Sequence, residues 1–313
     1  MKLRIVHSTR YRYAGPIAES VMEVRLKPMD GGGQRCLEFA LELSSRIKPR
    51  SYLDGYGNTV HYFNVSRPHS VLSIVSRSVV ETGLGDDADP REELVHDFLR
   101  FRSPVKEVDG VREIARLHAL AENSPSEAIE RALEALTLYI HREFVYDRAA
   151  TNVYSAVDEV LELKAGVCQD FAHLMLGLLR LSQVPCRYVS GYLHVERKGR
   201  EPSQSHAWIE FWAPSHGWVP FDPTHERAID ERYVVVGHGR HYDDVAPNRG
   251  IFRGAARETL RAEVRTTVSA AKPLSQLATE TRPIPLETFR EPPTRRAEHA
   301  VSALEDEQQQ QQQ

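Results

Sequence analysis

One stretch restricts the fold more than any other: the apolar segment from Val167 to about Ser182. Its spacing predicts a helix, and apolar side chains occupy most of that helix's circumference. Such a helix has to lie inside a domain, because any exposed face would leave apolar surface in water. The break at Lys164-Ala165-Gly166 precedes the segment and Pro185 follows it. We therefore expect a core packed around this helix.

Strand-like segments follow the helix, at Arg187–Val195, His206–Trp212 and Trp218–Phe221. Before it, from about Asp89 to Arg142, apolar residues recur with helical spacing, and Val157–Leu163 fits a further short helix. Helices followed by a run of strands indicate an α+β domain.

Residues 2 to about 82 read differently, as a series of short strands. Leu37, Phe39, Leu41 and Leu43 alternate with neighbours of mixed polarity, which is the period of a half-buried strand. Turn residues at 54–58 separate two such segments. Short strands divided by turns favour an antiparallel sandwich.

The remaining sequence completes a predicted division into three parts. Tyr233–Val236 and Leu260–Val268 look like strands, and after Ala271 prolines recur up to a run of six glutamines. We predict an N-terminal β domain over 1–85, a catalytic core with C-terminal strands over 86–270, and a disordered tail over 271–313.

Composition narrows the class of protein and of partner. A net charge of -4 gives no general attraction to nucleic acid, and no stretch reaches the roughly 18 apolar residues of a membrane span. The opening Met1–His7 alternates polar and apolar residues, unlike a secretory signal, so the expected compartment is the cytoplasm. No nucleic-acid or membrane partner is expected, and the oligomeric state stays open.

The three cysteines, Cys36, Cys168 and Cys186, include no C-x-x-C pair, which argues against a disulfide scaffold and a cysteine-rich zinc site. Cys36 and Cys186 are interpreted as core thiols. Fourteen histidines show no regular ligand spacing, so neither a metal nor a cofactor is expected.

Cys168 has the position of a nucleophile, in the first turn of the apolar helix, where the helix dipole and unpaired N–H groups favour a thiolate. His173 is the nearest histidine that follows, but five residues at about 100° each turn it roughly 140° away around the helix. Gln169 also points to a different side, so only the Cys168 backbone N–H is assigned as an oxyanion donor, and a second donor stays unassigned.

A base and an orienting acid are available elsewhere. His206 begins one predicted strand and Asp222 follows another, and a turn at Pro214–Gly217 would make these strands antiparallel neighbours. The carboxylate would then fix the imidazole tautomer and stabilise its charged form. Spacing alone leaves these residues as candidates.

Three ordered blocks, GVCQDFAH (166–173), SHAWIEFW (205–212) and GWVPFDPT (217–224), resemble the core motifs of the transglutaminase-like superfamily. The strands that include Tyr52-Leu53-Asp54 and Gly57-Asn58 resemble the β domain found ahead of the core in bacterial members. The resemblance implies a papain-like core, with a nucleophile helix packed on an antiparallel sheet. It also implies Cys168 as nucleophile, His206 as base and Asp222 as the orienting acid.

The implied chemistry is acyl transfer through a thioester, with a carboxamide or peptide carbonyl of a protein or peptide as substrate. Hydrolysis by a peptidase or amidase and transfer to an amine by a transglutaminase both stay open. An acyltransferase with a thioester donor is one alternative, and a non-catalytic binding or scaffold protein on the same fold is another.

Overall fold

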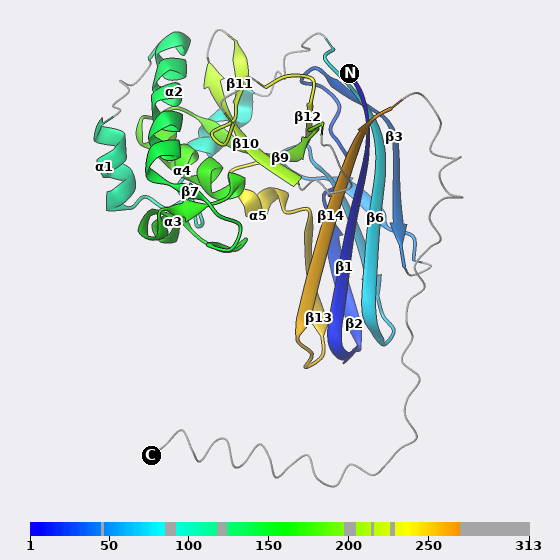
Figure 1. The fold of residues 1–313 in the computed structure, drawn as a ribbon. Helices are drawn as coiled ribbons and strands as arrows, with labels where there is room; N and C mark the ends of the chain where they lie inside the picture. The colour runs from blue at the N-terminus through cyan, green and yellow to red at the C-terminus, as the bar shows by residue number, and fades with distance from the viewer. Residues whose placement is uncertain are drawn as a thin grey trace, which may run out of the picture.

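Two four-stranded antiparallel sheets pack together along one side of the molecule in the computed structural model (Figure 1). The structure describes residues 1–44, 47–84, 92–117, 124–196, 205–213, 216–225 and 229–269. The first sheet has the order β14 (Glu258–Val268), β1 (Lys2–Ile17), β6 (His69–Thr82), β3 (Gln34–Leu43). The second has the order β13 (Asn248–Arg253), β2 (Glu19–Val24), β5 (Thr59–Val65), β4 (Arg50–Leu53).

Alternating side chains of β1 bring the two sheets together, whereas in β3 the predicted alternation fails at Leu37, which is exposed beside a register shift between Cys36 and Glu38. Along β1 buried positions recur at every second residue, so that Tyr11 and Tyr13 face inward. They meet Met22 of β2, Phe63 of β5 and Leu72 of β6 in one apolar cluster. Burial of this cluster removes apolar surface from water, which is the main force that holds a sandwich together.

The last two strands do not belong to the catalytic core, where the sequence placed them. In β14, Val268 pairs with Leu3 of β1, and in β13 Asn248 pairs with Val24 of β2. Local periodicity predicts a strand but not its partner, which here lies more than 200 residues earlier. The predicted disordered tail lies outside the described residues.

The predicted apolar helix is α4 (Cys168–Leu181), and every residue from Gln169 to Arg180 is buried. It packs on a third antiparallel sheet of order β11 (Gly217–Phe221), β10 (Ser205–Ala213), β9 (Cys186–Leu193), β12 (Tyr233–Gly239). This arrangement confirms the α+β, papain-like core.

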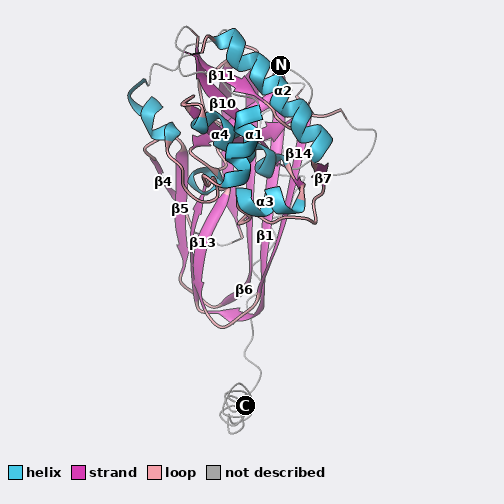
Figure 2. Ribbon diagram, turned by 90° about the vertical axis from the view of Figure 1, so that its left-hand side faces the viewer, coloured by secondary structure: helices cyan, strands magenta, loops and turns pink. Residues whose placement is uncertain are grey.

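The remaining elements lie around α4 and the third sheet, with α1 and α3 packed directly on α4 (Figure 2). They are η1 (Glu92–Leu99), α1 (Asp109–Leu117), α2 (Ser126–Glu143), β7 (Val145–Tyr146), α3 (Val157–Leu163), β8 (Ala165–Gly166) and α5 (Tyr242–Val245). Across the described part of the chain, none of the helices has the length and apolarity to span a bilayer.

Two side-chain amides of the sandwich join it to the third sheet, along the outer edge of β12. Gln34 accepts a hydrogen bond from the Val235 N–H and donates to the Val235 carbonyl, both at 2.8 Å. Asn58 does the same with His238, also at 2.8 Å for both bonds. The amides therefore take the place of a fifth strand, which satisfies backbone groups that an edge strand would otherwise leave unpaired.

Candidate active site

Cys168 is the first residue of α4, and the chain is held tightly just before it. The Asp170 carboxylate turns back to accept a hydrogen bond from the Val167 N–H at 2.8 Å and another from the Thr151 hydroxyl at 2.6 Å. Gly166 allows this approach, because a Cβ there would lie 2.7 Å from an Asp170 oxygen. The helix start is thus fixed with the Cys168 thiol, which is only partly buried, at the surface of a cavity.

His206 and Asp222 come from neighbouring antiparallel strands, as the sequence predicts. Strands β10 and β11 pair from Ala213 with Gly217 to Ile209 with Phe221, so Asp222 leaves β11 beside the start of β10. The His206 Nε2 donates to Asp222 Oδ2 at 2.7 Å. Residues 214–215 of the predicted turn lie outside the described residues.

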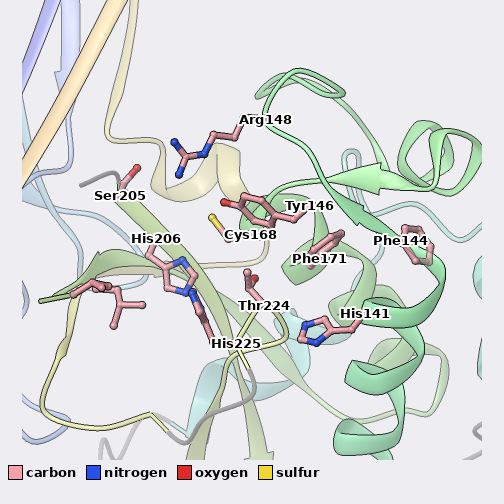
Figure 3. Close-up of a pocket in the computed structure, with 12 residues that line it drawn as sticks. His141, Phe144, Tyr146, Arg148, Cys168, Phe171, Ser205, His206, Thr224 and His225 are labelled. Carbon is pink, nitrogen blue, oxygen red and sulfur yellow. The ribbon is translucent and has the colours of Figure 1, made fainter. Parts of the chain in front are cut away.

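The His206 ring also forms a hydrogen bond with the Cys168 side chain, whose sulfur lies beside the ring in Figure 3. Although burial disfavours the charged ring, the bonds to Asp222 and to Cys168 raise the pKa of His206 to about 10. The imidazole is therefore protonated at neutral pH. A cation against the sulfur stabilises a thiolate, which is the reactive form of cysteine.

Asp222 accepts four hydrogen bonds although its side chain is fully buried. His206, His225 at 2.9 Å and the Tyr233 hydroxyl at 2.8 Å donate to Oδ2, and the Thr224 N–H donates to Oδ1 at 2.8 Å. Burial opposes the charge, but bonds from both histidines hold the pKa of this carboxyl well below its usual range. Asp222 is thus a carboxylate at neutral pH.

The residues that sequence reasoning set aside lie elsewhere. The His173 Nε2 accepts the Tyr242 N–H at 3.1 Å, and the Gln169 amide donates to the Val153 carbonyl at 3.2 Å. Cys186 is fully buried, as expected of a core thiol, whereas Cys36 in β3 is half-buried and outside the core clusters. Burial raises the pKa of both of these thiols to about 11.

A cavity of about 450 Å³ opens beside the sulfur (Figure 3). Its lining includes Cys168, His206, His225, Tyr146, Arg148 and Phe171. In Figure 3 the sulfur lies between the His206 ring and the Tyr146 hydroxyl. A second cavity of about 600 Å³ lies between α2 and β11, and Asp222 and His225 line it too.

His206, Asp222 and His225 offer ligand atoms within 4.8 Å of one another, so these three could geometrically hold a metal ion. However, the Asp222 oxygen between them already accepts bonds from both rings and from Tyr233. A cation there would have to displace these protons, including the one on the ring that faces Cys168. These hydrogen bonds suit Asp222 to orienting His206 better than to binding a metal ion.

Sequence reasoning did not identify four residues at this site. His225 and Tyr233 hold Asp222, and Tyr146 and Arg148 line the cavity beside Cys168. The position of His225, three residues after the candidate acid, was one available signal. Tyr146 lies in a strand of two residues, too short to show any period.

Two family profiles match the chain over separate ranges. The transglutaminase-like superfamily matches residues 117–223, which include Cys168, His206 and Asp222. The bacterial transglutaminase-like N-terminal region matches residues 3–81, which form most of the sandwich. Together these matches cover both layers of the fold.

Similar proteins support the same relationship over most of the chain. An uncharacterized protein of Mycobacterium tuberculosis is 35% identical over 278 residues, 80% of this chain and 87% of its own length. One from Mycobacterium leprae is 34% identical and is covered over 98% of its length. A protein-glutamine gamma-glutamyltransferase of Pseudomonas aeruginosa is 32% identical over 124 residues, 36% of this chain and 19% of that protein.

One solved structure supports the fold independently of close sequence similarity. A protein from Cytophaga hutchinsonii, described provisionally as a cysteine protease, superposes with a TM-score of 0.67. The match covers 87% of this chain and 93% of that chain, at 21% identity.

Proposed function

Because the chain belongs to the bacterial transglutaminase-like family, we propose that it is a thiol enzyme that cleaves a carboxamide or peptide bond through a thioester on Cys168. The observation that carries the proposal is the position of the His206 ring. It is hydrogen-bonded to Asp222 on one side and to the Cys168 side chain on the other, at the wall of an open cavity. Nucleophile, base and orienting acid in this order are the arrangement of a thiol acyl-transfer site.

The first half of the reaction uses the charges already described. The Cys168 thiolate attacks the carbonyl carbon, a C–S bond forms, and the carbonyl π electrons move to oxygen. The imidazolium of His206 then gives its proton to the nitrogen of the leaving amine as the C–N bond breaks. Asp222 keeps the ring oriented through this transfer and stabilises its charged form.

The second half needs an acceptor, and we favour water. Tyr146, which lines the cavity next to Cys168, is 46% exposed, so bulk solvent reaches the thioester. His206, now neutral, takes a proton from water as the oxygen attacks the thioester, and the thiolate leaves. The protein is then a peptidase or amidase acting on protein or peptide substrates.

Transfer to an amine is the second candidate. It is favoured by the similarity to the Pseudomonas aeruginosa protein-glutamine gamma-glutamyltransferase over 124 residues. An amine would attack the same thioester in the place of water, so the two reactions share the first half. The proposal further includes a cytoplasmic location, a compartment in which thiols stay reduced. It includes no cofactor, since Cys168, His206 and Asp222 supply the chemistry.

Selective alkylation tests the nucleophile, and the chain provides its own controls. Iodoacetamide at neutral pH should label Cys168 far faster than Cys36 and Cys186, because burial raises the pKa of the latter two thiols to about 11. Peptide mapping by mass spectrometry would give the three rates, and Cys168→Ser should remove only the fast one. Equal, slow labelling of all three cysteines would refute the proposal.

A second assay separates water from amine as the acceptor. Dimethylated casein and a fluorescent amine would be incubated with the parent and with Cys168→Ser. Release of ammonia or peptides without incorporation of the amine would support the hydrolase, and incorporation would support the transferase. Either activity has to disappear in the Cys168→Ser protein.

A further inference from the structure

Tyr146 is held by backbone hydrogen bonds against the residues that immediately precede Cys168. It lies in β7, which pairs in parallel with β8, so that Tyr146 is opposite Gly166. Hydrogen bonds from the Val145 N–H to the Lys164 carbonyl (2.9 Å) and from the Asp147 N–H to the Gly166 carbonyl (3.0 Å) fix this register on both sides. The phenol ring also packs edge-on against Phe171 of α4, with the centroids 6.1 Å apart. The tyrosine is therefore positioned by the same residues that position Cys168.

The hydroxyl end of Tyr146 points to the sulfur (Figure 3). Its oxygen accepts a hydrogen bond from the Cys168 backbone and another from the Arg148 side chain. Both bonds are donated to the phenol oxygen, so neither of them uses the phenol proton. Burial and the nearby Cys168 raise the pKa of Tyr146, so this proton stays on the oxygen at neutral pH.

The Cys168 N–H thus points to the Tyr146 oxygen, which lies beside the sulfur. That oxygen carries a second hydrogen-bond donor, the phenol O–H. An oxyanion needs two or more donors that converge where its charge develops. The side chain next to Cys168 in the sequence does not supply one, since the Gln169 amide donates to the Val153 carbonyl.

We propose that Tyr146, polarised by Arg148, is the second oxyanion donor of this enzyme, alongside the Cys168 backbone N–H. The proposal rests on the proposed function. When the thiolate attacks, the carbonyl oxygen replaces the phenol oxygen as acceptor of the Cys168 N–H and accepts the phenol O–H as well. Tyr146 keeps its proton throughout, and the leaving amine still receives its proton from His206.

The Arg148 guanidinium strengthens this donor without touching the substrate. A positive group that donates to the phenol oxygen draws electron density from the O–H bond and makes it a better hydrogen-bond donor. Arg148 is thus a positioning residue for Tyr146, and its loss should reduce turnover less than loss of the hydroxyl.

Tyr146→Phe removes the hydroxyl and keeps the ring against Phe171. Its kcat should fall by about 10²–10³, as for loss of one oxyanion donor, with little change in KM. Alkylation of Cys168 by iodoacetamide should stay close to the parent rate, because displacement of iodide develops no oxyanion. Tyr154→Phe is the matched control: Tyr154 is 85% exposed and does not line the cavity.

A peptide aldehyde gives a second readout, because its tetrahedral adduct with a thiolate carries the oxygen that Tyr146 would bind. Tyr146→Phe should weaken this inhibitor by a factor similar to the loss in kcat, whereas Tyr154→Phe should change neither value. Full turnover in Tyr146→Phe, or slower alkylation in step with turnover, would overturn the assignment of Tyr146. Slow alkylation of Cys168 in the parent protein would instead refute the thiol-enzyme proposal itself.

Discussion

The side-chain amide of Asn58 connects the sandwich to the third sheet, and its removal should show how much this connection stabilises the protein. Asn58 is fully buried and forms hydrogen bonds with both backbone groups of His238 on β12. Asn58→Ala removes both bonds, together with the one that the amide donates to Asp54 at 3.0 Å, and leaves the N–H and the carbonyl of His238 facing the space that the amide filled. A buried polar group that loses its partner costs about 1–3 kcal/mol, so the pair should cost about 2–6 kcal/mol, nearer the lower value if water enters.

Thermal unfolding measures this cost directly. In a chain of this size one kcal/mol shifts Tm by about 2 °C, so Asn58→Ala should unfold about 4–12 °C below the parent. Asn64→Ala on the exposed face of β5 makes the same chemical change, and its Tm should stay close to that of the parent. Equal Tm values for Asn58→Ala and the parent would show that the amide does not hold the two layers together.

Two further predictions concern the pair of His206 and Asp222. Asp222→Asn should lower kcat/KM by about 10⁴, as loss of the orienting carboxylate does in other triads. Titration with a thiol reagent should still detect Cys168 in this variant. Unchanged kinetics would remove Asp222 from the triad. This variant is preferable to Asp222→Ala, which would leave four donors without an acceptor. Stability should depend on pH: the pKa of His206 rises from 6.5 to about 10, so its contribution is complete below pH 6.5 and is lost as the pH rises to about 10. Asp222, with a pKa lowered from 3.8, contributes above pH 3.8 and loses that contribution as the pH falls further. Urea unfolding of the parent and of His206→Gln should therefore give free energies that converge between pH 6.5 and 10, and a constant difference would contradict the pairing.

The sequence predicts those parts of the fold that a local period encodes. The apolar helix appears as α4, and the segment at His206–Trp212 lies within β10, because burial on one face imposes the pattern that the residues display. The juxtaposition of His206 and Asp222 could also be predicted, since a tight turn between antiparallel strands brings their ends together. Their catalytic roles stay a prediction until they are tested.

Other features lacked any such signal. Asp170, His173 and Arg180 are polar residues of α4, yet all three are buried. Arg180 donates to the carbonyls of Arg100, Cys186 and Arg240, which lie on segments far apart in the sequence. Polar residues that satisfy distant backbone groups look the same in a sequence as residues that face water. Tyr146 escaped notice for a similar reason, because its position depends on pairing with β8.

The return of β13 and β14 to the sandwich makes the catalytic core an insertion within another domain. During synthesis from the N-terminus, β1 and β2 emerge first, but each has one open edge until residues 248–268 have been added. Open strand edges recruit other chains, so the nascent protein carries this hazard through the synthesis of the whole core. Once β13 and β14 have paired, the sandwich holds both ends of the core. Two segments of the chain connect the core to the sandwich, one at each end of the core. A single proteolytic cut in one of these segments would therefore not release the core.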